Sequence, residues 1–272
     1  MIITLTTDFG LKDPFVGVMK GVILGIAPEV RIVDISHDIP SYDILDAAIV
    51  VHEASRYFPD GTIHVVVVDP GVGGARRPIA IQAIPLPKGE GGPTASRLEG
   101  RVRGTNQLFL APDNGALSLV IAGAESSFTR HITNSSLFHH PVSQTFHGRD
   151  IFAPVAAHLA AGKAFESVGP IVNDVVQHPA DQTPTILRVD KFGNLLTNIR
   201  HDQLGSGFAI RVGGIEIRRI LSNYEEALPG EIFAIEGSSG LIELSMNQGS
   251  AALRLNLQRG VEIEVETGTL NP

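Results

Sequence analysis

Side chains capable of acid–base chemistry follow the most apolar segment of the chain. Four consecutive valines at 65–68 lead into a loop that carries Asp69, a Pro-Gly turn, two further glycines and the arginines Arg76 and Arg77. A run of valines without polar alternation predicts a strand buried on both faces, as in the middle of a mostly parallel sheet. Because α/β sheets bind ligands beyond the carboxyl ends of their strands, Asp69 is the first candidate for a functional residue.

Polar side chains at the ends of other predicted elements would converge on the same edge of a parallel sheet. They are Asp8 after the predicted strand 2–7, Asp113 and Asn114 after the predicted strand 107–111, and His147 ahead of a predicted helix at 151–161. Each of these residues alone is also typical of an ordinary turn or helix cap. Their convergence at one edge is what indicates a site.

Two other chemistries deserve comparison. The glycines after the valine strand could cradle a phosphate, but their spacing fits neither the Rossmann nor the Walker pattern, and the Asp69 carboxylate would repel a phosphate. A Mn²⁺ or Mg²⁺ site could use Asp8, Asp69, His147 and Asp150. The arginines after Asp69 disfavour a nearby dication, so we expect no metal ligands.

The alternation of strands and helices in residues 1–172 predicts an α/β domain with a central, mostly parallel sheet flanked by helices. The polar segment 173–184 is predicted to link it to a smaller all-β barrel or sandwich at 185–272, whose strands are short and which shows no helix. The Gly- and Pro-rich stretch 85–104 is predicted to be a flexible surface loop. The predicted strands are 2–7, 30–35, 65–68, 79–84, 107–111, 128–132, 185–189, 208–212, 215–220, 231–235, 241–245 and 261–265, and the predicted helices are 15–26, 44–58 and 151–161.

Composition excludes several classes of protein. The chain has no cysteine, which removes disulfides, thiolate metal sites and a cysteine nucleophile. Its net charge of −8 argues against a nucleic-acid partner and is compatible with a cationic small substrate. No apolar run approaches the ~20 residues of a membrane span and no signal peptide is visible, so we expect no membrane partner and a cytoplasmic location.

Six spaced motifs together resemble one family. They are Thr7-Asp-Phe-Gly10, Asp69-Pro-Gly-Val-Gly-x-x-Arg76, Ala111-Pro-Asp-Asn-Gly115, Phe146-His-Gly-Arg-Asp150, Asp190-Lys-Phe-Gly-Asn194 and Asn247-Gln-Gly-Ser-Ala-Ala252. The resemblance is to the S-adenosyl-L-methionine (SAM) hydrolases, or SAM hydroxide adenosyltransferases, relatives of fluorinase and chlorinase. It implies attack of water on ribose C5′ of SAM to give adenosine and L-methionine, with SAM as substrate and without a metal or cofactor. It also implies a homotrimer in which SAM lies between the first domain of one subunit and the second domain of its neighbour.

The resemblance assigns roles to individual residues. Asp69, Arg76 and His147 match the family's catalytic residues, and Arg77 would replace Arg76 if the motif were shifted by one position. The matching substrate-binding residues are Asp8 for the ribose hydroxyls, Tyr42 as an aromatic wall, Asp190 for the methionine ammonium, Asn194 for the adenine edge, Tyr224 for adenine stacking, and Ser238 for the base or the methionine carboxylate. The alternative for the second-domain positions is a structural turn or a core aromatic.

Two further functions stay open at this stage. A halide-using adenosyltransferase is suggested by the insertion at 85–104, where fluorinase also carries one. Against it, halogenating relatives carry an uncharged aromatic where Asp69 stands and a hydroxyl-bearing residue where Val72 stands, and an anionic carboxylate repels halide. The other alternative is a non-catalytic protein that binds SAM or adenosine.

Overall fold

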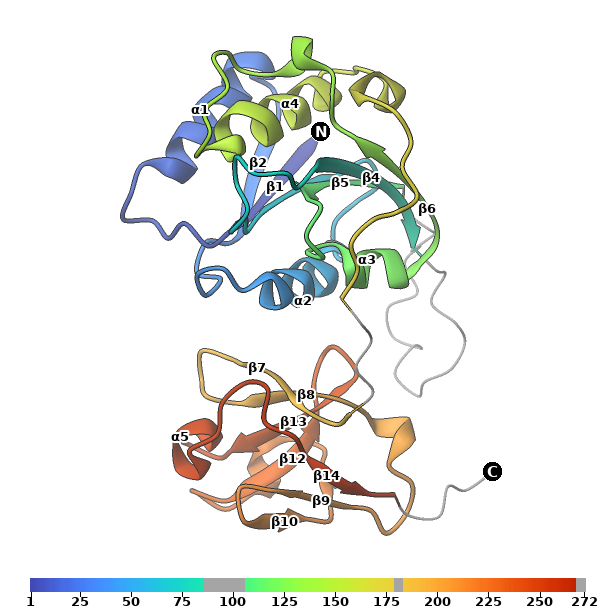
Figure 1. Cartoon of the computed structure of the whole chain (residues 1–272). Coiled ribbons are helices and arrows are strands. Elements are labelled where there is room, and N and C mark those ends of the chain that lie inside the picture. Colours follow the sequence, from blue (N-terminus) through green and yellow to red (C-terminus); the bar gives the residue numbers. More distant parts are fainter. Residues whose placement is uncertain (86–105, 179–182, 268–272) are drawn as a thin grey trace. The chain divides into compact units, whose positions relative to one another are not determined.

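The computed structural model describes residues 1–85, 106–178 and 183–267, and the chain divides into two compact units, Met1–His178 and Pro179–Pro272. The first unit is built on a six-stranded sheet of order β2-β1-β3-β5-β4-β6 (Figure 1). Its strands are β1 (Ile2–Thr7), β2 (Arg31–Ser36), β3 (Ile63–Val67), β4 (Pro78–Pro85), β5 (Gln107–Pro112) and β6 (Ala124–His131). Strands β2, β1, β3 and β5 pair in parallel, whereas β4 pairs antiparallel with both β5 and β6. The predicted mostly parallel sheet is confirmed.

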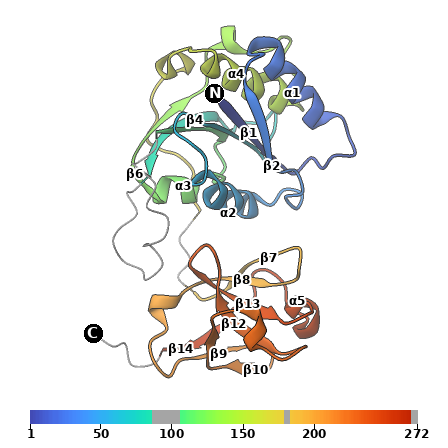
Figure 2. The ribbon, with the colours of Figure 1, turned by 180° about the vertical axis from the view of Figure 1, so that it is seen from behind.

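Both faces of this sheet are covered by helices. Helices α1 and α4 lie on one face and α2 and α3 on the other (Figures 1 and 2). Val65 and Val67 belong to the core on the α1 and α4 side, and Val66 and Val68 belong to the other core. The valine run is therefore buried on both sides, as its lack of polar alternation predicts. The helices are α1 (Phe15–Ile26), α2 (Ile44–Ser55), α3 (Ser118–Ala122) and α4 (Ala153–Ala160).

Short elements account for most differences from the predicted helices. Helix α3 has only five residues, too few to show a helical period, and the sequence did not predict it. The predicted helix 151–161 is preceded by a π-helical turn, η3 (Gly148–Phe152), and becomes α-helical only in α4. This turn directly follows His147.

The second unit consists mainly of two sheets of order β11-β12-β13-β8-β7 and β10-β9-β14 that share one core. Its strands are β7 (Ile186–Val189), β8 (Leu195–Arg200), β9 (Ala209–Val212), β10 (Ile215–Ile217), β11 (Ile220–Leu221), β12 (Ile232–Glu236), β13 (Leu241–Met246) and β14 (Glu264–Glu266). The predicted absence of helices is wrong, because α5 (Ala251–Leu255) forms where the Ser250 side chain caps Leu253 N–H. Strand β8, which pairs with β7 and β13, was also not predicted.

The segment predicted as a linker is divided between the units. Residues up to His178 belong to the first unit: the amides of Val176 and His178 donate to Asp113 and Ser118. The predicted surface loop lies outside the described residues except for Pro85, the last residue of β4. Within the described ranges, no helix combines the length and apolar character needed to cross a bilayer.

Candidate active site

A cavity of about 390 Å³ opens at the carboxyl end of the parallel strands in the first unit. Asp8, directly after β1, and Asp69, which follows β3, both line it, as do Tyr42 and His147. Neighbouring parallel strands deliver their carboxyl ends to one edge, which explains why residues 61 positions apart share a cavity. Asp113 and Asn114 do not line this cavity.

Arg76 joins Asp69 and His147 into one hydrogen-bonded cluster. Arg76 Nε donates to Asp69 Oδ1 at 2.8 Å, and its Nη2 donates to Asp69 Oδ2, so the pair is bidentate. Nη2 also lies 2.6 Å from Nδ1 of His147. The side chains of Arg76 and Asp69 are only 10% and 4% exposed, so water screens this ion pair weakly.

The protonation of His147 follows from its partner. A guanidinium has only donors, so His147 Nδ1 must accept and the ring proton sits on Nε2. Burial lowers the pKa of His147 and the charge of Arg76 lowers it further, although Asp69, Asp150 and the backbone of Ser143 act in the opposite direction. The neutral imidazole is therefore favoured near neutral pH.

This geometry predicts the acid limb of the activity profile. Imidazolium has no acceptor for Arg76, so protonating His147 breaks the cluster. Because the pKa lies below its ordinary value of 6.5, kcat/KM should fall to half its maximum only below pH 6.5. A pH profile of kcat/KM checks this, and a half-maximum at or above pH 6.5 would contradict it.

Arg77 has different partners from Arg76. Its Nε donates to Asp113 at 2.9 Å and its Nη1 donates to Asp174 at 2.8 Å. Asp113 also accepts Val176 N–H, so this arginine ties β5 to the segment after Ile171. The structure thus separates the two consecutive arginines: Arg76 contacts the cavity residues Asp69 and His147, and Arg77 is structural.

The four residues considered for a metal do not form a cation site. The Asp150 carboxylate is fully buried and bonded to Arg149 and to the amide of Ser143, and Asp69 is bonded to Arg76. Within residues 1–85, 106–178 and 183–267, no cluster of three or more His, Asp or Glu side chains could hold a metal ion.

Gly73 allows the loop that carries Arg76 and the loop that carries His147 to touch. It adopts φ +75°, and a Cβ at this position would overlap the carbonyl oxygen of Gln144, three residues before His147. The absence of a side chain thus lets the loop that carries Arg76 pack on the loop that carries His147.

We expect Gly73→Ala to lower both stability and activity, because the two loops must separate. The matched control is Gly162→Ala, where φ is +94° but no atom lies within 4 Å of the added Cβ, so only backbone strain of about 1–2 kcal/mol applies. Urea denaturation and turnover of folded protein measure both effects. Equal losses in the two variants would contradict the role of the close contact.

Sequence reasoning missed several residues of the first cavity. The rings of Phe9, Phe15 and Phe146 line it and pack edge to face, with centroids 5.2–6.0 Å apart. Tyr42, which was among the predicted residues, is held at φ +69°, unusual for a bulky residue, and its N–H donates to Asp8 Oδ2 at 2.9 Å. Clustered phenylalanines beside the quoted motifs were the available signal.

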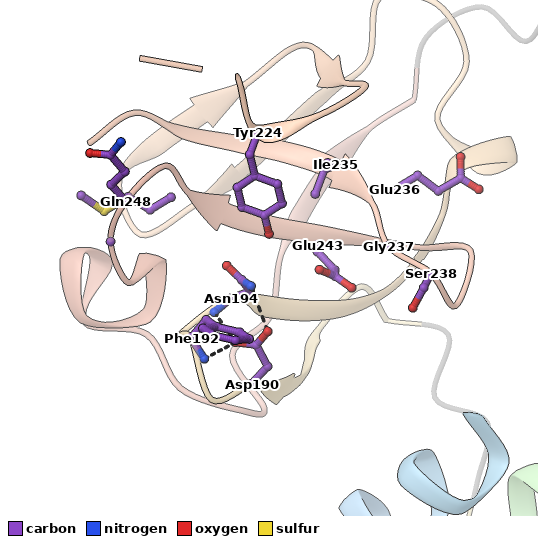
Figure 3. Close-up of a pocket in the computed structure, with 12 residues that line it drawn as sticks. Asp190, Phe192, Asn194, Tyr224, Ile235, Glu236, Gly237, Ser238, Glu243 and Gln248 are labelled. Carbon is purple, nitrogen blue, oxygen red and sulfur yellow. Dashed lines mark hydrogen bonds between the residues drawn. The ribbon is translucent and has the colours of Figure 1, made fainter. Parts of the chain in front are cut away.

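The predicted second-domain residues gather around another cavity, of about 610 Å³, within the second unit (Figure 3). Asp190 and Asn194 come from the turn between β7 and β8, Tyr224 precedes β12, and Ser238 lies between β12 and β13. The Tyr224 hydroxyl donates to Ser245 at 3.1 Å. Phe192, whose side chain sequence reasoning did not assign, also lines the cavity and is 75% exposed.

Much of the Asp190 carboxylate is used within its own turn. It accepts the backbone N–H groups of Phe192 and Asn194 and the side-chain amide of Asn194, at 2.8–2.9 Å (Figure 3). A carboxylate offers about four acceptor positions, so one is left for a ligand. The backbone carbonyl of Asn194 accepts the Asp190 N–H, so the turn presents the side-chain oxygen Oδ1 of Asn194 and one lone pair of Asp190.

Comparison with known proteins covers both units. Residues 3–84 and 92–169 match the SAM hydroxide adenosyltransferase N-terminal domain, and residues 184–264 match the C-terminal domain. The chain belongs to the SAM hydroxide adenosyltransferase family. The family resemblance noted in the sequence is thereby confirmed.

Several known proteins align with this chain over nearly its full length. The (R)-S-adenosyl-L-methionine hydrolase of Thermus thermophilus is 35% identical, covering 95% of this chain and 97% of its own. The fluorinase of Nocardia brasiliensis is 28% identical, covering 98% and 97%. The crystal structure of an uncharacterized conserved protein from Thermotoga maritima is 34% identical with a TM-score of 0.84, covering 97% and 100%.

Proposed function

We propose that this protein hydrolyses SAM to adenosine and L-methionine. Water attacks ribose C5′, the C5′–S bond breaks, and its electron pair goes to sulfur, which leaves as a neutral thioether. One proton is released per turnover. Full-length (R)-SAM hydrolase relatives support the reaction, and the observation that carries it for this chain is the Asp69 carboxylate, held by Arg76 at both oxygens beside a cavity.

Asp69 is assigned the role of orienting the water and accepting its proton. Arg76 occupies one acceptor position on each oxygen, which fixes the carboxylate plane and leaves the remaining lone pairs for water. His147 Nε2–H is a neutral donor that can stabilise hydroxide character as the water loses its proton. A sulfonium needs no acid to depart, so the rate depends on aligning water with the C5′–S bond, and no metal or cofactor is invoked.

The binding roles are distributed over both cavities. Asp8 accepts from the ribose hydroxyls, and Tyr42 supplies an aromatic wall. In the second unit, Asp190 is assigned the methionine ammonium and Asn194 the adenine edge, while Tyr224 stacks on the base. Ser238 contacts the base or the methionine carboxylate. We further propose a homotrimer in which SAM contacts the first unit of one subunit and the second unit of its neighbour.

Subunit mixing tests the shared site. Asp69→Asn disables the first-unit cavity and Asn194→Ala disables the second-unit cavity. Co-expressing the two inactive chains should restore activity in about a quarter of the sites if each site draws on two subunits. Mixtures as inactive as the separate variants would refute sharing.

Product analysis tests the reaction itself. Protein incubated with SAM and EDTA in H₂¹⁸O should release adenosine labelled at the 5′ oxygen and unlabelled methionine. A 5′-halo-5′-deoxyadenosine formed with chloride or fluoride would instead indicate a halide-using adenosyltransferase. SAM recovered intact after tight binding would indicate a binding protein without turnover.

A further inference from the structure

His37 is a buried residue, directly after β2, that the proposed mechanism does not use. Its side chain is 4% exposed, yet both ring nitrogens have polar neighbours. Nε2 lies 3.1 Å from Asp34 Oδ1, and Nδ1 lies 2.8 Å from Thr7 Oγ1. Nε2 makes no hydrogen bond with the described residues, although the Asp34 carboxylate lies beside it. In the neutral ring with its proton on Nε2, Nδ1 accepts from the Thr7 hydroxyl.

Asp34 is itself fixed from the other side. Its Oδ2 lies 2.5 Å from Lys20 Nζ of α1. Burial raises the pKa of Asp34, but the hydrogen bond from Lys20 and the proximity of His37 outweigh burial and hold it below its ordinary value. The imidazole of His37 therefore lies between the Lys20–Asp34 ion pair and Thr7 of strand β1.

His37 contacts the residues on either side of Asp8, Thr7 through its imidazole and Gly10 through its backbone carbonyl. Thr7 Oγ1, the partner of the imidazole, accepts Phe9 N–H at 3.3 Å, and the His37 carbonyl accepts Gly10 N–H at 2.8 Å. Residues before and after Asp8 are thus both tied to His37. The turn that aims the Asp8 carboxylate into the cavity has its shape set by these bonds.

The same histidine begins the loop that reaches Asp8 from the other direction. This loop runs from His37 to Tyr42, whose N–H donates to Asp8 Oδ2. One carboxylate oxygen is therefore positioned by a loop anchored at His37. The other oxygen carries no hydrogen bond from the described residues.

We propose that His37 is a positioning residue that fixes the Asp8 carboxylate for recognition of the ribose diol. The inference rests on the proposed function, in which Asp8 accepts from the two ribose hydroxyls. A carboxylate can take two hydroxyls at once only in one orientation, so a shift of the turn loses one of the bonds. His37 itself touches no substrate.

The chain offers a matched control in a second buried threonine–histidine pair on β1. His64 Nδ1 lies 2.7 Å from Thr4 Oγ1, and both residues are fully buried. Neither residue lines the cavity. His64→Ala therefore reproduces the loss of a buried imidazole and its bond to β1 without touching the Asp8 turn.

Calorimetric binding of adenosine and 2′,3′-dideoxyadenosine to the full chain measures diol recognition. Wild-type protein should prefer adenosine by at least about tenfold, since hydrogen bonds to a charged acceptor are strong. His37→Ala should remove most of this preference, and His64→Ala should keep it. Thr7→Val deletes only the hydroxyl at nearly constant volume and should reproduce the loss of preference. His37→Asn keeps an amide near the Nδ1 position and should restore most of the preference for adenosine.

The outcomes separate this inference from the hydrolase proposal. A preference retained in both His37→Ala and Thr7→Val would overturn it, as would an equal loss in His64→Ala. Wild-type protein that hydrolyses SAM but binds both nucleosides equally would overturn it and leave the hydrolase proposal standing. A diol preference that depends on His37 in a protein without turnover would support it and refute the hydrolase proposal alone.

Discussion

Asp69→Asn is expected to lower kcat for SAM hydrolysis by about 10²–10⁴-fold, the usual contribution of a positioned general base. An amide cannot take the proton of the attacking water. In the asparagine an NH₂ group, which can only donate, also replaces one of the two carboxylate oxygens that accept hydrogen bonds from Arg76. Adenosine binding should be nearly unchanged, because the ribose is assigned to Asp8. Single-turnover release of adenosine and calorimetric adenosine binding measure the two effects.

Asp113→Asn is the matched control for this variant. Asp113 is also a buried carboxylate beyond a parallel strand and is also paired with an arginine, Arg77, but it does not line the cavity. We expect it to lose stability while folded protein keeps its turnover. Equal loss of turnover in both variants would show that strand-end packing, not carboxylate chemistry, controls the rate, and an active Asp69→Asn would remove Asp69 from the mechanism.

A large loss of stability is expected in acid from His64. This imidazole is fully buried and stacks on Phe109, with ring centroids 4.8 Å apart. Burial lowers its pKa to about 3. As the pH falls, the unfolded chain binds a proton at this imidazole near pH 6.5, whereas the folded chain binds it only near pH 3. The free energy of unfolding is therefore unaffected by His64 above pH 6.5 and decreases as the pH falls toward 3.

The size of this loss follows from the difference in pKa. Each unit corresponds to 1.36 kcal/mol, so the free energy of unfolding should fall by about 4 kcal/mol between pH 6.5 and pH 3 from this residue alone. Urea denaturation at successive pH values measures the slope. His64→Gln should reduce the slope by about 1.4 kcal/mol per pH unit in that range, and an unchanged slope would assign the acid sensitivity to other groups.

The sequence predicted the parts of the molecule that local patterns control. The valine run identified the central strand and Asp69 after it, and the resemblance of the spaced motifs added Arg76 and His147 as candidates. It could not decide between Arg76 and Arg77, because consecutive residues have the same chemistry until the fold turns one to the cavity and the other to Asp113.

Residues whose roles depend on distant partners were beyond sequence reasoning. The sequence of the loop that follows β2 indicates only a polar loop. The contact of His37 with Thr7 could not be predicted from it, because that contact depends on the parallel pairing of β1 and β2. Strand β8 starts directly after the turn at 190–194, and it was not predicted because the sequence there was interpreted only as a binding motif. Short elements such as α3 carry too few residues for a period to emerge.

The contact of Gly73 with the Gln144 carbonyl has a consequence for how substrate binding energy is used. Backbone packing holds the loop of Arg76 against the loop of His147. Folding therefore supplies the free energy needed to orient Asp69, Arg76 and His147. SAM then need not supply it on binding, and its interactions can act on the sulfonium and the approaching water.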